Sequence, residues 1–178
     1  MKKNSLIKSG AMIIILTLIC RVLGAIRDMV IAAKFGSGVV TDVYFLALSA
    51  VSLFSVYLKQ AIHTTGIPIL STVKHDSGYA EKNKATNNLL FSFLLLSVVV
   101  AILAFICMPF IMRILGTGLD IDNAKEATKL ARIGLPSIFF IVIIGVYRAY
   151  IQCEDKFAES AFSEVPHNLI YILYLAIF

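Results

Sequence analysis

Three ionisable side chains lie inside one long apolar segment near the start of the chain. Residues 10–33 read GAMIIILTLICRVLGAIRDMVIAA and contain Arg21, Arg27 and Asp28. Apolar residues resume directly after Arg21, which favours one continuous membrane helix over a short segment that ends there. A charge near the centre of such a helix costs roughly 2.5–3.5 kcal/mol on insertion scales. Charges placed there are typical of a protein-lined aqueous cavity, so we predict that this segment carries the functional site.

The spacing of these residues indicates a single polar face. At 100° per residue, Thr17, Arg21, Gly24 and Asp28 fall within one narrow stripe, and Arg27 flanks it. Two cations against one anion leave this face with a positive charge, which would attract an anionic ligand such as a diphosphate and repel a cationic one. The alternative is that these charges only pair with neighbouring helices.

A second polar face is expected between residues 43 and 73. Ser52, Ser55, Lys59 and His63 recur at spacings of three and four, which places them on one side of a helix. A polar stripe in lipid should face protein or water, so we expect it to meet the charged stripe of the first helix. Lys59 would then join the binding site, whereas Gly24, Ser52 and Ser55 would serve gating or helix packing.

The composition is that of an integral membrane protein. The chain has 178 residues, of which 59% are hydrophobic and 15% are charged, against about 45–50% apolar residues in soluble domains. The net charge of +5 is better explained by Lys and Arg in cytoplasmic loops than by nucleic-acid binding. The three cysteines lie in or beside apolar runs without matched spacing, so we expect no disulfide, no metal site and no cofactor.

The apolar runs predict an all-α, polytopic transmembrane bundle of about five helices. Pro68 is expected to kink or end the second helix, and Pro136 to bend the fourth. Polar residues predict loops at 74–83 and 116–123. The predicted helices span residues 8–34, 43–73, 86–115, 124–152 and 161–178.

The charges between the runs indicate a multi-pass protein of the cell membrane with its N-terminus in the cytoplasm. Lys34, Arg113 and Lys125 would then lie outside. The last apolar run is still open at Phe178, so we expect the chain to be a truncated piece of a longer protein, or its last helix to be completed by packing. The lysines placed inside are Lys2, Lys3, Lys8, Lys74, Lys82, Lys84 and Lys156.

The stretch CRVLGAIRD at residues 20–28 resembles the first-helix signature of the lipid II flippase family (MurJ, also called MviN), which reads approximately S-R-x-L-G-x-x-R-D. Weaker matches follow in the family's order and extend the resemblance over nearly the whole chain. They include Phe35-Gly36, Thr41-Asp42, Tyr44-Phe45, Pro68-Ile69-Leu70, Lys156-Phe157, Ala161-Phe162 and Asn168.

The resemblance implies a much longer flippase with two lobes around a cationic cavity, of which this chain is the N-terminal part of one lobe. Such a protein moves the undecaprenyl-diphosphate-linked peptidoglycan precursor, lipid II, across the membrane by alternating access. It implies that Arg21 and Arg27 bind the diphosphate or its sugars, that Asp28 orients them or takes part in the switch, and that Asp42 lies at the outer gate. The implied partners are the lipid-linked sugar, membrane lipids and the remainder of the flippase.

The second helix departs from the family pattern. Many members carry Arg-Arg followed by Glu-Gly there, whereas residues 55–61 read SVYLKQA. Lys59 lies on the polar stripe and would replace the missing cation. An ammonium, however, does not form the two parallel hydrogen bonds to a phosphate that a guanidinium forms. A flippase for another polyprenyl-linked saccharide therefore stays open.

The sequence offers two alternatives to transport. A membrane enzyme acting on lipid phosphates would need paired carboxylates for a metal, or a nucleophile with a base, and the sequence has no such run. The histidines His63, His75 and His167 are expected to be structural or exposed, and Asp120 and Asp122 to solvate a turn. We therefore expect a transporter and no enzyme. The remaining alternative is a non-transporting membrane fragment or scaffold.

Overall fold

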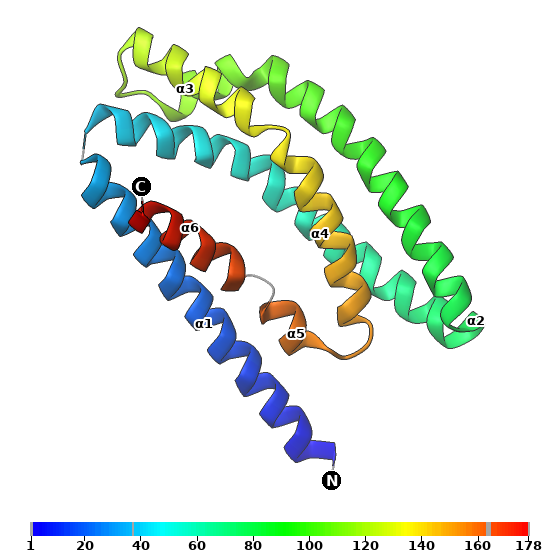
Figure 1. Cartoon of the computed structure of the whole chain (residues 1–178). Helices are drawn as coiled ribbons and strands as arrows, with labels where there is room; N and C mark the ends of the chain where they lie inside the picture. The colour runs from blue at the N-terminus through cyan, green and yellow to red at the C-terminus, as the bar shows by residue number, and fades with distance from the viewer. Residues whose placement is uncertain (1, 37, 163–164, 178) are drawn as a thin grey trace. The chain divides into compact units, whose positions relative to one another are not determined.

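The structure, a computed structural model, describes residues 2–36, 38–162 and 165–177. Nearly all of these residues are helical, and no strand occurs among them, which confirms the predicted all-α class. Figure 1 shows the course of the chain. The helices are α1 (Lys2–Phe35), α2 (Val39–Leu115), α3 (Ile121–Gly134), α4 (Ser137–Gln152), α5 (Phe157–Phe162) and α6 (Val165–Ile177).

The chain divides into two compact units, and each is described by itself. In one unit α5 and α6 pack against α1, and in the other α3 and α4 pack against α2. The first unit contains Arg21, Arg27 and Asp28, whereas Lys59 belongs to the second. The expected meeting of the two polar stripes involves both units, so it stays a prediction.

Helix α2 consists of two helical arms that join at Gly78. This residue has φ 80° and ψ −173°, a backbone region open almost only to glycine. Figure 1 shows the cyan first arm (residues 39–77) and the green second arm (residues 79–115) meeting at a reversal of the chain. The predicted polar loop at residues 74–83 is wrong, because one glycine is sufficient for the turn and both arms remain helical up to it.

The prolines act differently at the two predicted positions. Helices α3 and α4 are bent by 44° at the break that contains Leu135 and Pro136, which confirms the predicted bend. The first arm of α2 continues through Pro68, so the helix does not end there. The helix expected from residue 161 starts earlier, as α5 at Phe157.

The unit of α2, α3 and α4 has a tightly packed interior and an apolar exterior. Ile62, Leu70 and Met108 from α2 are at most 1% exposed, as are Ile138 and Val142 from α4. Among the described residues, α2 contains a segment apolar enough to cross a membrane, and α3 with α4 pass the same test as one bent span. Only 11% of the most apolar window of α2 is buried. Apolar side chains that face outward on this scale suit a lipid environment.

Candidate functional site

In α1, two of the three predicted site residues form an ion pair with each other. Arg27 donates from Nε and from its terminal nitrogen to Asp28 Oδ1, at 3.0 and 2.8 Å. The two side chains are partly buried, with 27% and 47% of their surfaces exposed. Asp28 therefore offsets the charge of its sequence neighbour, and the positive charge predicted for this face remains at Arg21.

Arg21 lies on a different side of α1 from the buried residues of that helix. Cys20 and Ile31 are 7% and 5% exposed, whereas Thr17 and Arg21 are exposed. A side chain added at Gly24 would meet no atom within 4 Å. The side of α1 that carries Arg21 and Gly24 is thus open within its own unit, as a face that receives a ligand or another helix requires.

The two serines of the polar stripe predicted on α2 lie apart from the cavity that Lys59 and His63 line. Ser55 is buried, and its hydroxyl donates to Val51 O at 3.0 Å. Ser52 is exposed and donates to Ser49 O at 2.7 Å, so both hydroxyls are used within their own helix. Asp42 is exposed in the first turn of α2. Neither serine lines the cavity that the rest of the stripe forms.

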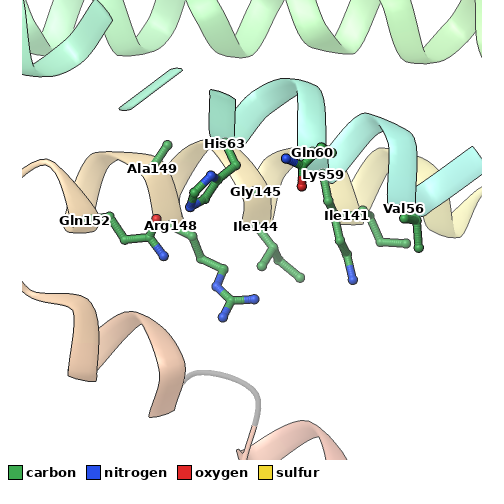
Figure 2. A pocket seen from close by; sticks show the side chains of 10 residues that line it. All are labelled: Val56, Lys59, Gln60, His63, Ile141, Ile144, Gly145, Arg148, Ala149 and Gln152. Atoms are coloured by element: carbon green, nitrogen blue, oxygen red, sulfur yellow. The ribbon is translucent and has the colours of Figure 1, made fainter. Parts of the chain in front are cut away.

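Lys59 and His63 line a cavity of about 400 Å³ between the first arm of α2 and α4. Figure 2 shows that the α4 side is formed by Arg148 and Gln152 together with smaller and apolar residues. In this view the side chains of Lys59 and Arg148 extend from the two helices toward the same side. The full lining is Val56, Lys59, Gln60, His63, Ile141, Ile144, Gly145, Arg148, Ala149 and Gln152.

Small residues bring these two helices close together beside the cavity. A Cβ atom at Gly66 would lie 3.3 Å from Ala149 Cβ, and a Cβ atom at Gly145 would lie 3.1 Å from Ile62 Cδ1. Such close approach of helix backbones is typical of small residues at membrane helix contacts. The packing of Gly66 and Gly145 therefore sets which residues of α2 and α4 face each other.

The described lining of the cavity carries basic side chains and no acidic one. Among the described residues, the ten that line it include Lys59 and Arg148 but no Asp or Glu. No ion pair of Lys59 occurs within the described part of the chain. Gln60 and Gln152 add amide groups, which donate and accept hydrogen bonds. This combination of groups suits an oxyanion that carries neighbouring hydroxyl or amide groups.

Arg148 and His63 line the cavity, but the sequence did not identify them as site residues. Arg148 interrupts the apolar helix α4, and the rule that selected Arg21 applies to it equally. His63 was expected to be structural or exposed; it is exposed, and it also lines the cavity. The signal for Arg148 was present in the sequence, but its position in the same cavity as Lys59 was not.

Other reactive groups of the chain have local roles. Asp120 caps α3 by accepting from Ile121 N at 2.8 Å, so it does more than solvate a turn. Asp122 pairs with Lys125 at 2.9 Å, and His75 lies 3.0 Å from Asp76. Within the described residues, no group of three or more His, Cys, Asp and Glu side chains is placed to hold a metal ion.

The chain is similar to one known family over most of its length. The family model described as "Lipid II flippase MurJ" matches residues 31–178. A "Probable lipid II flippase MurJ" from Vibrio cholerae is 30% identical over 181 residues, which cover 94% of this chain and 34% of the relative.

Two further relatives give the same result. A "Probable lipid II flippase MurJ" from Buchnera aphidicola subsp. Baizongia pistaciae is 29% identical, covering 97% of this chain and 34% of the relative. A "Lipid II flippase MurJ" from Thermosipho africanus is 26% identical, covering 95% of this chain and 35% of the relative. The chain thus spans about a third of the length of the curated relatives it matches.

Proposed function

The chain belongs to the lipid II flippase MurJ family, and we propose that it is the N-terminal part of a flippase that moves lipid II across the cell membrane by alternating access. Its substrate would be the undecaprenyl-diphosphate-linked peptidoglycan precursor. The remainder of the flippase and the surrounding membrane lipids would be its partners. The names of the relatives support a transporter and not an enzyme.

The observation that carries the proposal is the positive charge on the open side of α1. Asp28 offsets Arg27, and Arg21 remains exposed between the apolar residues of α1. A cation costs free energy in lipid unless water or an anion accompanies it. The diphosphate of a lipid-linked sugar would supply that anion, and a guanidinium can bind a phosphate group through two parallel hydrogen bonds.

We assign the site residues the roles that the family resemblance implies. Arg21 would contact the diphosphate directly. Arg27 would bind the diphosphate or its sugars, and Asp28 would hold the Arg27 guanidinium in place until the substrate arrives or the protein switches state. Asp42 would take part in the outer gate, and Lys59 would supply a further cation. Of these roles, the orienting role of Asp28 is supported by its two hydrogen bonds with Arg27.

The proposed orientation places the N-terminus and the Gly78 turn in the cytoplasm. Lys74 and Lys84 lie on the two sides of that turn. Cytoplasmic loops are enriched in Lys and Arg. The turn between α2 and α3 would then lie on the outer side.

The test is complementation by the intact flippase. Arg21→Ala and Arg27→Ala should each prevent growth of a flippase-depleted strain while membrane abundance stays at the wild-type level. Arg113→Ala is the matched control, because Arg113 is an exposed arginine in the last turn of α2, and it should complement fully. Full complementation by both α1 variants would overturn the proposal.

A further inference from the structure

The exposed side of α3 is charged in the first part of the helix. Asp122 pairs with Lys125 at 2.9 Å, and Glu126 pairs with Lys129 at 3.8 Å. All four side chains are at least 65% exposed. These two pairs place two ammonium groups and two carboxylates on about two turns of helix. The surface that they form is rich in charge but electrically balanced.

The exposed side of α3 becomes apolar toward the end of the helix. Leu130 and Ile133 are 41% and 75% exposed, and Phe140 of α4 is 68% exposed. Ala127 and Ala131, which are at most 1% exposed, belong to the side of α3 that packs within the protein. The outward side of the helix thus changes from charged to apolar along its length, as a helix at a membrane surface requires.

The lengths of α3 and α4 place part of their bent span outside the hydrocarbon core of a membrane. The helices have 14 and 16 residues, which corresponds to about 21 and 24 Å at the helical rise per residue. A hydrocarbon core is about 30 Å thick, which is less than the two helices together. At least one end of this span therefore lies among or beyond the headgroups.

Contacts with the second arm of α2 locate the boundary on α3. The apolar run of that arm starts at Leu89, and about twenty helical residues, enough for a hydrocarbon core, lead to Pro109. Arg132 contacts Phe105, about one turn before Pro109. Because α3 runs back along the arm after a short turn, it reaches the level of Pro109 about one turn before Arg132. That level is near Lys129, where the charged part of the helix ends.

We propose that the bilayer boundary crosses α3 near Lys129, and that the charged first part of the helix binds the headgroups of zwitterionic phospholipids. Such a headgroup carries one phosphate and one ammonium group. The phosphate is attracted by the lysines, and the ammonium group by the carboxylates. An anionic headgroup would match the lysines alone and would be repelled by Asp122 and Glu126. Leu130 and Ile133 contact the acyl chains.

The experiment measures the depth of α3 by fluorescence quenching of bimane labels. Lys125→Cys, Ile133→Cys and Phe140→Cys are made in a chain whose native cysteines are alanine, and the labelled proteins are placed in phosphatidylcholine nanodiscs. All three positions are exposed, so the label displaces no buried packing. A bimane–glutathione adduct gives the value for water.

Two spin-labelled lipids distinguish the possible depths. Phosphatidylcholine with a TEMPO headgroup should quench the Lys125→Cys label more strongly than phosphatidylcholine with a doxyl group on its chain. The order should be reversed for Ile133→Cys and Phe140→Cys. A Lys125→Cys label that neither lipid quenches would lie in water or against protein, and this result would overturn the proposal. Stronger quenching of that label by the doxyl lipid would also overturn it.

The class of lipid is tested with a label at Leu130→Cys, which leaves both ion pairs intact. In discs of equal parts phosphatidylcholine and phosphatidylglycerol, TEMPO-phosphatidylcholine should quench this label as strongly as its share of the lipid predicts. Asp122→Asn with Glu126→Gln leaves two unpaired lysines, which attract phosphatidylglycerol, and should lower the quenching about twofold. Equal quenching in the two proteins, or depletion of phosphatidylcholine already with the pairs intact, would overturn the assignment to zwitterionic headgroups. None of these outcomes depends on lipid transport, so the α1 test of the flippase is unaffected.

Discussion

The Arg132 side chain donates a hydrogen bond to the carbonyl of Phe105, which has no helical backbone donor because residue 109 is a proline. The Nε atom of Arg132 donates to Phe105 O at 3.2 Å, and the guanidinium lies 4.3 Å from the centre of the Phe105 ring. In a regular helix the N–H of residue 109 would donate to this carbonyl, but proline has no N–H. A side chain from α3 thus satisfies the carbonyl that an interior proline leaves open in α2.

The first prediction concerns this relationship. Arg132→Met should destabilise the protein by about 1 kcal/mol, the net contribution of a hydrogen bond. In a Pro109→Ala background the same change should cost clearly less, because alanine restores a backbone N–H that can donate to Phe105 O. Thermal unfolding in detergent, followed by circular dichroism, measures the four proteins of this cycle. An equal cost in both backgrounds would contradict the assignment.

The second prediction concerns the turn between the arms of α2. Gly78 has φ 80° and ψ −173°, and a Cβ atom there would meet nothing within 4 Å. The effect of Gly78→Ala is therefore purely conformational, and we expect a loss of about 1–3 kcal/mol. Ser77→Ala, in the preceding helical residue, should leave the unfolding temperature nearly unchanged. Similar unfolding temperatures for the two variants would refute this explanation of the turn.

The third prediction concerns Lys82, which is fully buried. Its Nζ lies 3.5 Å from the centre of the Tyr150 ring and donates to Tyr150 O at 3.4 Å, while the Tyr150 hydroxyl donates to Asn83 at 3.1 Å. Tyr150 O belongs to the last turn of α4, where a cation is favourable. Lys82 therefore ties the end of α4 to the second arm of α2.

Lys82→Ala should cost about 2–4 kcal/mol, since it removes a buried cation–π contact and leaves a cavity. The matched control is Lys84→Ala. Lys84 is 71% exposed and pairs with Glu81 at 2.7 Å, and exposed ion pairs of this kind contribute little. Comparable unfolding temperatures for the two alanine variants would argue against the anchoring role of Lys82.

The fourth prediction tests the orientation in the membrane. In a protein whose native cysteines are replaced by alanine, a cysteine is placed at Ser77, next to the Gly78 turn, or at Thr117, between α2 and α3. A membrane-impermeant maleimide should label Thr117→Cys in intact cells, and Ser77→Cys only after permeabilisation. The two ends of the second arm would then lie on opposite sides of the membrane. The reverse labelling pattern would place the N-terminus outside.

The sequence by itself determined the features that depend on local chemistry. The apolar runs established the helical class, and Pro136 marked the bend between α3 and α4, because a proline removes a backbone N–H and its ring crowds the preceding turn. The ionisable residues of α1 were recognisable because a charge in an apolar run is rare. The prediction of a loop at residues 74–83 was wrong for a local reason too, since composition does not show that one glycine is sufficient to reverse the chain.

Only the tertiary structure decided which helices share a site. Helical periodicity places Lys59 and His63 on one face of α2, but it does not indicate that Arg148 of α4 lines the same cavity. That pairing depends on close approach at Gly66 with Ala149 and at Gly145 with Ile62. In the same way, Arg132 reaches Phe105 only because α3 packs against the second arm of α2. Spacing along a chain fixes the face of a single helix, whereas contacts between helices depend on the packing of side chains from distant segments.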